Sequence, residues 1–243
     1  MGTWAASALM VPVQGIRLDA MTGKQEVGGI LQKLSPGIRG VITIYGEGGS
    51  GKTMICLEAC INVALQGKKI IYVDPQNNFS AERIKQIAPD GKARDILSKI
   101  IIVTPEGFED QEKLFDRLRK GIREGVGLLV VDPISVFYRL EFAKKDKKAY
   151  LINRNLGVQL SYLNDISRKS NIPVFITAQV QASPETKQEA SIVGGSVIDH
   201  MSGYVIEIRR IDNKRRQVVL KKPKGTGRKE VAFEILEKGI SIL

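Results

Sequence analysis

One short glycine-rich segment of the sequence carries residue types that could bind phosphate. Residues 46–53 read GEGGSGKT and match the pattern GxxxxGK[ST]. Glycines let backbone N–H groups approach phosphate oxygens closely, while the lysine reaches the β- and γ-phosphates and the threonine hydroxyl binds Mg²⁺. A helix that begins at this point would add the positive end of its dipole. We therefore predict a nucleotide site formed by Gly46, Glu47, Gly48, Gly49, Ser50, Gly51, Lys52 and Thr53.

Asp132 is the second residue that could serve this site. It ends the apolar segment GLLVVD at residues 127–132 and stands directly before Pro133. In nucleoside triphosphatases with this loop, an aspartate at the end of a buried strand holds Mg²⁺ together with the loop hydroxyl. The simpler alternative is that Asp132 only begins the turn at Pro133. Its occurrence downstream of the glycine-rich loop favours the metal role, so we predict Thr53 and Asp132 as metal ligands.

Alternating apolar and amphipathic segments surround these residues. Short β-branched runs without polar alternation are typical of parallel strands buried on both faces, and the intervening segments have helical spacing. Strands are predicted at residues 41–45, 68–74, 99–105, 127–132 and 172–180, with helices at 52–66, 80–88, 110–124 and 149–169. We expect an α/β fold, a mostly parallel sheet flanked by helices.

The end of the chain has a different pattern. Three apolar runs follow one another with only short turns, at residues 204–210, 216–222 and 230–236. Such spacing predicts a C-terminal antiparallel meander added to the parallel sheet. Residues 1–20 show no periodicity and are predicted to be irregular. We therefore expect a single core domain over residues 21–243.

Composition narrows the class of partner. The chain has 243 residues, 43% of them hydrophobic, and a formal net charge of +11. The charge is concentrated, with +4 in residues 139–154 and +9 in residues 209–229. Basic segments of this kind favour an anionic partner such as nucleic acid. The two cysteines, Cys56 and Cys60, are expected in the core, and no apolar run has membrane-spanning length. We expect a soluble cytoplasmic protein.

The chain resembles the RecA/RadA-family recombinase ATPases, and within them the shorter archaeal RadB-like paralogues of RadA. The resemblance extends from about Gly23 to the C-terminus. It rests on the order of GEGGSGKT, YVDPQNNFSAERI, LLVVDPISVFYR, IPVFITAQVQA, GGSVIDHMSGYVIEIRR and FEILEKGI. It implies a RecA-like P-loop NTPase core that binds ATP with Mg²⁺ and DNA and assists homologous recombination or DNA repair. A RadA-type recombinase or a second copy of the chain would be a further partner.

The resemblance also implies roles for single residues. Gln179 matches the sensor of the γ-phosphate, and His200 matches a histidine that links a DNA-contacting loop to the nucleotide. Arg83 matches an arginine beside the adenine. Residues 181–193 and 139–148 correspond to two DNA-binding loops. Their basic residues are Arg139, Lys144, Lys145, Lys147, Lys148 and Lys187.

Two departures from the family pattern matter. Gln76 stands where the family has the glutamate that activates the attacking water. A neutral amide can orient water but cannot take its proton, and loss of a general base lowers the rate by roughly 10²- to 10⁴-fold. We therefore predict ATP binding with slow hydrolysis, and Lys52, Gln76 and Gln179 as the catalytic set. Second, only about 20 residues precede the core, whereas RadA has a helical DNA-binding domain there. This favours a paralogue.

Alternatives remain open at this stage. A KaiC-like signalling ATPase would use the same nucleotide site to act on protein partners without DNA. The lysines of residues 139–148 could form an ordinary solvated surface. Lys221, Lys222 and Lys224 could extend a DNA surface, reach the nucleotide of an adjacent subunit, or lie on a plain hairpin. Because only 6% of residues are aromatic, we expect weak base stacking on single-stranded DNA and low sequence preference.

Overall fold

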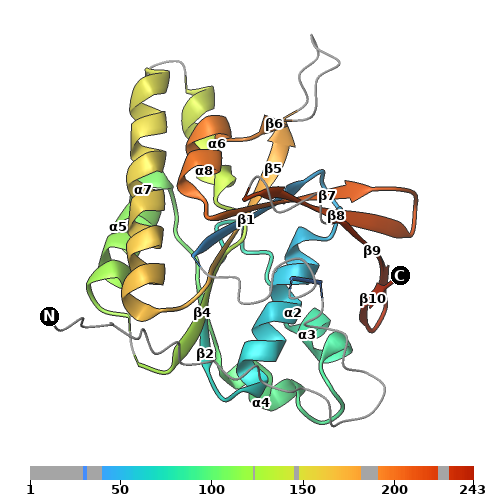
Figure 1. The fold of residues 1–243 in the computed structure, drawn as a ribbon. Helices are drawn as coiled ribbons and strands as arrows, with labels where there is room; N and C mark the ends of the chain where they lie inside the picture. The colour runs from blue at the N-terminus through green and yellow to red at the C-terminus, as the bar shows by residue number, and fades with distance from the viewer. Residues whose placement is uncertain (1–29, 32–39, 123, 145–147, 182–190, 224–229) are drawn as a thin grey trace, which may run out of the picture.

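The computed structural model of the chain describes residues 30–31, 40–122, 124–144, 148–181, 191–223 and 230–243 (Figure 1). The predicted irregular segment at residues 1–20 lies outside these ranges. The strands are β1 (Val41–Gly46), β2 (Lys69–Val73), β3 (Ile100–Val103), β4 (Val126–Val131), β5 (Val174–Gln181), β6 (Ser191–Ile192), β7 (Tyr204–Arg210), β8 (Arg215–Lys222), β9 (Glu230–Leu236) and β10 (Gly239–Ile242). The helices are α2 (Lys52–Leu65), α3 (Ala81–Ile87), α4 (Ala93–Ser98), α5 (Phe108–Lys120), α6 (Ser135–Ala143), α7 (Ala149–Ser170) and α8 (Gly195–Met201).

The strands form one mixed sheet in the order β10-β9-β8-β7-β1-β5-β4-β2-β3, and β6 pairs with β5 outside this path. Strands β1, β2, β3, β4, β5 and β7 run parallel. From β7 onward the sheet continues through antiparallel pairs to β8, β9 and β10. This arrangement confirms the predicted α/β class with a C-terminal antiparallel meander.

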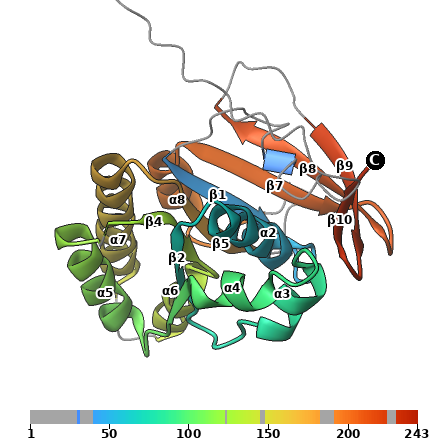
Figure 2. The ribbon, with the colours of Figure 1, turned by 90° about the horizontal axis from the view of Figure 1, so that it is seen from below.

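Helices cover both faces of the parallel part of the sheet. Successive residues of a strand point to opposite faces, so each strand contributes side chains to both cores. In β2, Ile70 and Tyr72 join the core under α2, α3 and α4, while Ile71 and Val73 join the core under α5, α6 and α7. Figure 2 shows the two helical layers on either side of the sheet. Cys56 and Cys60 are fully buried in the first of these cores, as predicted.

Helix boundaries follow local chemistry. Ser80 begins α3 by accepting a hydrogen bond from the Arg83 backbone at 3.1 Å, and Asn171 ends α7 in the left-handed conformation. Helix α5 has Glu109 and Asp110 in its first turn and basic residues in its last, which complements the helix dipole. It ends at Lys120, before Gly121, and not at residue 124 as the sequence pattern predicted.

The structure differs from the expected elements in three respects. The basic stretch 139–148 was expected to be a loop, but its first part belongs to α6, which continues the chain directly after the Asp132–Pro133 turn. Phe137 and Tyr138 of α6 are buried. Their packing therefore stabilises a helix in a segment whose proline and basic residues are typical of a turn or loop. Helices α4 and α8 were not anticipated. Strand β3 is not buried on both faces, because it forms the sheet edge and leaves Ile101 and Ile102 nearly half exposed.

Candidate nucleotide-binding site

The sheet register brings the predicted site residues to one edge. Gly46, the last residue of β1, lies beside Gln179 of β5 and Ile208 of β7. Strand β4 pairs with β5 up to Val131 opposite Ile176, so Asp132 emerges one position later at the same edge. Carboxyl ends of parallel strands are where α/β sheets bind ligands. The glycine-rich loop, the aspartate and the glutamine therefore meet there.

The loop between β1 and α2 requires glycine at specific positions. A Cβ on Gly46 would overlap the backbone oxygen of Ile208, which lies on the neighbouring strand. Gly49 and Gly51 have φ angles of +70° and +105°, in the left-handed region that residues with a side chain rarely adopt. These constraints explain why the pattern needs glycines, and they give the loop the tight turn that phosphate binding uses.

The start of α2 fits an anion. Its first N–H groups have no partner within the helix, Gly51 supplies no side-chain cap, and the first turn contains no acidic residue. The Ser50 hydroxyl is fully buried and has no hydrogen-bond partner among the described residues. A buried hydroxyl without a partner, beside the unpaired N–H groups of a helix start, suits phosphate oxygens. The chemistry of the loop therefore fits the phosphates of a nucleoside triphosphate.

Lys52 points back over the loop. Its Nζ donates to the backbone oxygens of Gly46 at 2.9 Å and Glu47 at 2.7 Å. The side chain is largely buried, and this desolvation lowers the Lys52 pKa, while the nearby Asp132 carboxylate opposes the shift. A bound phosphate would supply the negative charge that a buried ammonium needs. A phosphate-binding role for Lys52 at the first turn of α2 stays a prediction.

Two side-chain donors orient Asp132. The Tyr72 hydroxyl donates to Oδ2 at 2.7 Å, and the Thr177 hydroxyl donates to Oδ1. Burial is the largest cause of a strongly raised Tyr72 pKa, so its hydroxyl stays protonated and remains a donor. The carboxylate is therefore fixed at the strand edge. Neither donor was identified from the sequence, because each is separated from Asp132 by more than 40 residues.

Thr53 is exposed and follows Lys52 at the beginning of α2. In the described part of the chain, no three His, Cys, Asp or Glu residues cluster in a way that could hold a metal ion. Magnesium at this edge would then be held by Thr53, Asp132 and the phosphates themselves, an arrangement typical of this loop class. Bound there, MgATP would supply the phosphoanhydride whose cleavage the site could assist.

Gln76 lies on the loop after β2. The buried Asp74 carboxylate accepts hydrogen bonds from the backbone N–H groups of Gln76 at 3.3 Å and Phe79 at 2.7 Å. This fixes the turn, and the Gln76 side chain is exposed. The turn follows a strand that pairs with β4 in parallel, so it opens at the same edge as Asp132. A water-orienting role for Gln76 stays a prediction.

Gln179 is contacted by α6. Its side-chain Oε1 accepts a hydrogen bond from Arg139 Nη1 at 2.6 Å, and its backbone N–H approaches Ser135 Oγ at 3.5 Å. Its backbone oxygen accepts from the Val193 N–H at 2.9 Å. Gln179 lies beside Gly46 in the sheet register, and the chain continues after β5 into residues 182–190, which lie outside the described residues. The role of Gln179 as a γ-phosphate sensor stays a prediction.

Arg83 contacts the C-terminal hairpin. Its guanidinium donates to the backbone oxygens of Leu236 at 3.0 Å and Glu237 at 3.1 Å, and to the side chain of Gln86. These bonds tie α3 to the turn between β9 and β10. An adenine contact by Arg83, which the family resemblance implies, stays a prediction.

His200 lies on α8, and its Nδ1 is 2.7 Å from the Ser196 backbone oxygen. Lys222 of β8 donates to the backbone oxygen of Asp199 at 2.7 Å, near the carboxyl end of the same helix. This contact holds α8 against the edge of β8. Of the three lysines whose role was open, Lys221 pairs with Glu207 at 3.2 Å, Lys222 contacts the backbone of α8, and Lys224 lies outside the described residues.

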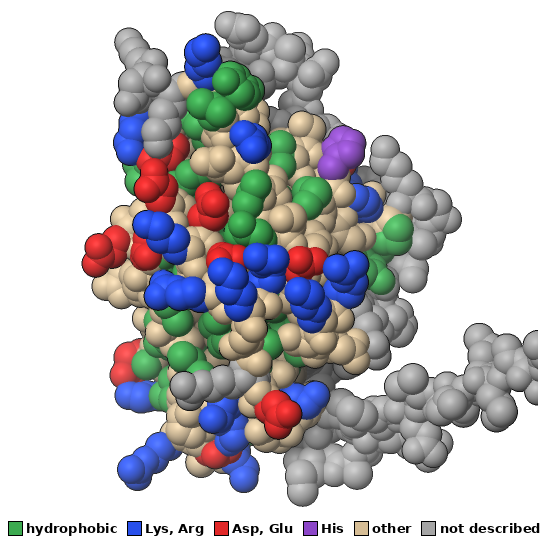
Figure 3. Space-filling view, turned by 90° about the vertical axis from the view of Figure 1, so that its left-hand side faces the viewer, with side chains coloured by type: hydrophobic (Ala, Val, Ile, Leu, Met, Phe, Trp, Pro, Cys, Tyr) green, Lys and Arg blue, Asp and Glu red, His purple; other side chains and the backbone are tan. Residues whose placement is uncertain are grey.

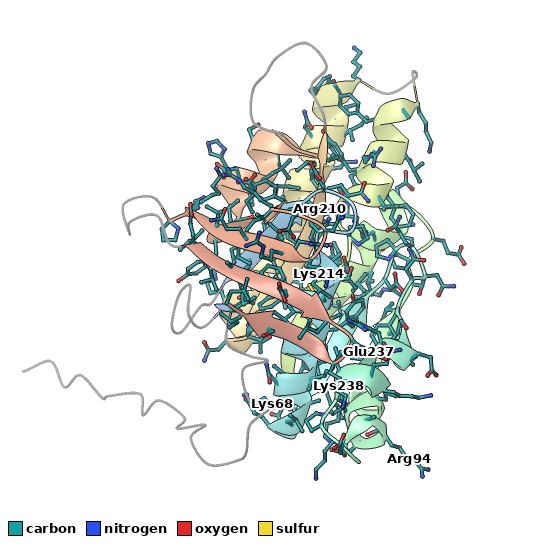
Figure 4. The ribbon with its side chains drawn as sticks, turned by 90° about the vertical axis from the view of Figure 1, so that its right-hand side faces the viewer. Lys68, Arg94, Arg210, Lys214, Glu237 and Lys238 are labelled. Atoms are coloured by element: carbon teal, nitrogen blue, oxygen red, sulfur yellow. The ribbon has the colours of Figure 1, made fainter. Side chains whose placement is uncertain are left out.

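Arg210 is a neighbour of the loop that the sequence pattern did not reveal. Its Nη2 is 3.4 Å from the Gly48 backbone oxygen and 3.2 Å from where a Gly49 Cβ would stand. Figure 4 shows Arg210 beside the loop between β1 and α2. In the sequence, Arg210 is recognisable only as a basic residue at the end of an apolar run. The pairing of β7 with β1 brings it to the loop.

The predicted DNA-contacting residues are partly described. Arg139 binds Gln179, Lys144 pairs with Glu141 at 2.6 Å, and Lys148 is exposed at the start of α7. Lys145, Lys147 and Lys187 lie outside the described residues. Leu140, Phe142 and Tyr150 are at least half exposed around this junction of α6 and α7. Basic and apolar side chains therefore adjoin there, near the top of the face in Figure 3.

The sequence matches a known protein family. A profile of the Rad51 family matches residues 17–242, nearly the whole chain. The chain belongs to the Rad51 family. This confirms the resemblance to RecA/RadA-type ATPases on which the residue roles were based. Proteins of this family use nucleotide, typically with Mg²⁺.

Several similar members of the family are RadB proteins. The DNA repair and recombination protein RadB of Methanocaldococcus jannaschii is 35% identical over 206 residues, which cover 84% of this chain and 94% of that protein. RadB of Methanococcoides burtonii is 37% identical over 192 residues, covering 77% and 84%. A solved structure described as the crystal structure of the RadB recombinase has a TM-score of 0.70 and 28% identity, covering 86% and 94%. The RecA-like fold is thereby confirmed.

None of the described helices is both long and apolar enough to cross a membrane.

Proposed function

We propose that this Rad51-family protein binds MgATP and DNA, hydrolyses ATP slowly, and assists homologous recombination or DNA repair. The recombination or repair role is supported by the family match and by the relatives named RadB. One observation carries the ATP part of the proposal. The strand register places Gly46 and Gln179 side by side, with Asp132 at the same edge.

The DNA part of the proposal rests on the junction of α6 and α7. It joins exposed basic residues, Lys144 and Lys148, to the exposed aromatic rings of Phe142 and Tyr150. Single-stranded DNA binds to surfaces that combine cations for the backbone with rings on which bases stack. Helix α6, which leads to the junction, begins shortly after the carboxyl end of β4, at the sheet edge where the nucleotide loop lies.

The amino end of α7 adds to this surface. Lys148 caps the helix without a side-chain hydrogen bond, and the first turn contains no acidic residue. Among the described residues, the first turn of this 22-residue helix has no carboxylate to balance its positive end, and a DNA phosphate would provide negative charge there. Lys144 is partly neutralised by Glu141, so Lys148 is the stronger candidate of the two described lysines.

A salt titration of single-stranded DNA binding tests the proposal. If about six phosphates are neutralised, log affinity falls against log salt with a slope near −4. In Lys144→Glu/Lys148→Glu, we expect the slope to weaken by roughly 1 to 2 and affinity to fall at every salt concentration. Fluorescence anisotropy with a labelled oligonucleotide and MgATP gives both quantities.

The matched control is Lys92→Glu/Arg94→Glu, which makes the same charge change on exposed residues at the start of α4. Figure 4 shows Arg94 at the lower end of the molecule. Equal slopes for the wild type and the Lys144→Glu/Lys148→Glu variant would contradict the assigned surface. No ATP-dependent retention of DNA by the wild type would contradict DNA binding itself and favour a signalling ATPase that acts on proteins.

A further inference from the structure

The contact between Arg139 and Gln179 gives the arginine a role different from the expected DNA contact. Arg139 Nη1 and Gln179 Oε1 are 2.6 Å apart, although the two residues are 40 positions apart in sequence. Ser135, one helical turn before Arg139, approaches the Gln179 backbone N–H at 3.5 Å. One face of α6 thus contacts both the backbone and the side chain of Gln179.

Chemistry fixes the orientation of the glutamine amide in this contact. A side-chain amide carries an acceptor oxygen and a donor nitrogen at its two ends, and a guanidinium has donors only. The end that meets Arg139 must therefore be the oxygen. Nε2, with its two N–H groups, is turned to the other side of the amide. Without Arg139, either end could face the phosphate site.

This orientation matters because Gln179 neighbours the phosphate loop. The register pairs it with Gly46, the first residue of the glycine-rich segment. Phosphate oxygens accept hydrogen bonds and cannot donate them when ionised, so a glutamine that senses phosphate must present nitrogen. The backbone of Gln179 is fixed, because its N–H approaches Ser135 Oγ and its oxygen accepts a hydrogen bond from the Val193 N–H. Only the side-chain amide then remains to be oriented.

We propose that Arg139 is a positioning residue that binds Gln179 Oε1 and thereby directs Nε2 toward the γ-phosphate position. The proposal rests on the proposed ATP binding and on Gln179 as the phosphate sensor. Arg139 does not touch the nucleotide, and its effect passes entirely through the amide of Gln179. Its loss therefore weakens the distinction between ATP and ADP more than it weakens nucleotide binding as such.

The experiment measures the ratio of the Kd for MgADP to the Kd for the magnesium complex of ATPγS, a slowly hydrolysed ATP analogue. Isothermal titration calorimetry is performed without DNA, so that a phosphate contact of Arg139 cannot contribute. We expect Gln179→Ala to lower the ratio about tenfold, the typical effect of one hydrogen bond to a charged group. Arg139→Met should lower it roughly three- to tenfold.

A double-mutant cycle separates this role from a general structural one. If Arg139 acts only through Gln179, the double variant has the same ratio as Gln179→Ala alone. Arg139→Lys should recover part of the ratio, because an ammonium is also a donor without acceptors. Arg154→Met removes an exposed arginine from the neighbouring helix α7 and should leave the ratio unchanged.

The outcomes are distinct. The inference is overturned if Arg139→Met keeps the wild-type ratio while Gln179→Ala loses it, or if the two effects add fully in the double variant. A wild type that binds both nucleotides equally would overturn it together with the sensor role of Gln179. A wild type that binds neither nucleotide would instead overturn the proposed function at its first step.

Discussion

Replacing Gln76 by glutamate is expected to accelerate ATP hydrolysis by roughly 10²- to 10⁴-fold, the usual contribution of a positioned general base. The Gln76 amide can orient a water molecule but cannot accept its proton. The turn that carries the residue is fixed by the Asp74 carboxylate, which accepts hydrogen bonds from two of its backbone N–H groups. A carboxylate at position 76 would therefore occupy the same place without rebuilding the loop.

Single-turnover hydrolysis of MgATP measures this effect, with and without DNA. Asn78→Asp is the matched control, since it converts another exposed amide of the same loop into a carboxylate and should change the rate by less than about twofold. Two results would contradict the account. One is a Gln76→Glu rate no higher than that of the wild type. The other is rapid wild-type turnover that Gln76→Ala leaves unaltered.

Glu58→Gln is expected to stabilise the protein in alkaline solution by roughly 3 to 5 kcal/mol, since each unit of pKa difference corresponds to about 1.4 kcal/mol. Glu58 lies on α2, is 4% exposed, and accepts a hydrogen bond from the Ile240 N–H at 2.8 Å. Burial raises its pKa from 4.5 to about 8, while the Ile240 hydrogen bond and Arg83 oppose the shift. The charged form is therefore disfavoured in the folded state.

The sign of the pH dependence follows from this shift. Between pH 4.5 and about 8 the folded protein holds a proton on Glu58 that the unfolded chain releases. The free energy of unfolding therefore falls as pH rises through that window. A glutamine keeps an oxygen for the Ile240 N–H and has no proton to lose, so the dependence on pH should flatten.

Urea unfolding at pH 5, 7 and 9 tests this prediction. The wild type and Glu58→Gln should have similar stability at pH 5 and diverge as pH increases. Glu82→Gln is the control, because Glu82 is an exposed carboxylate on the neighbouring helix α3 and its change should be within about 0.5 kcal/mol. Parallel curves for the wild type and Glu58→Gln would show that Glu58 does not hold its proton in the folded state.

The site residues that could be predicted from the sequence are those with local signals. The glycines and Lys52 follow one another in eight residues, and Asp132 ends an apolar strand. Their patterns reflect requirements of the backbone, such as the left-handed conformation of Gly51, that few other residues meet. The alternation of strands and helices likewise predicted the parallel sheet and its meander.

The partners of these residues could not be predicted because they depend on strand order. Tyr72 and Thr177 reach Asp132 only because β2 and β5 flank β4 in the sheet. Arg210 reaches the phosphate loop because β7 pairs with β1, which lies more than 150 residues earlier in the chain. Hydrophobic periodicity does not encode such neighbours.

Helix α6 was missed for a different reason. Pro133 and the basic residues after Ala143 are signals of turns and loops. Buried Phe137 and Tyr138 pack against α7 and the sheet, and this tertiary packing outweighs the local signals. The consequence for the site is direct, since Arg139 belongs to a helix that contacts Gln179 and not to a free loop.

Retention of MgATP is the central claim, and equilibrium dialysis measures it most directly. Wild-type protein should bind MgATP saturably, and Lys52→Ala should bind at least about a hundredfold more weakly, because a buried charge contact to phosphate is lost. Lys68→Ala, which changes an exposed lysine beyond the far end of α2, should bind like the wild type (Figure 4). Absence of saturable MgATP retention by the wild type at millimolar magnesium would contradict the account.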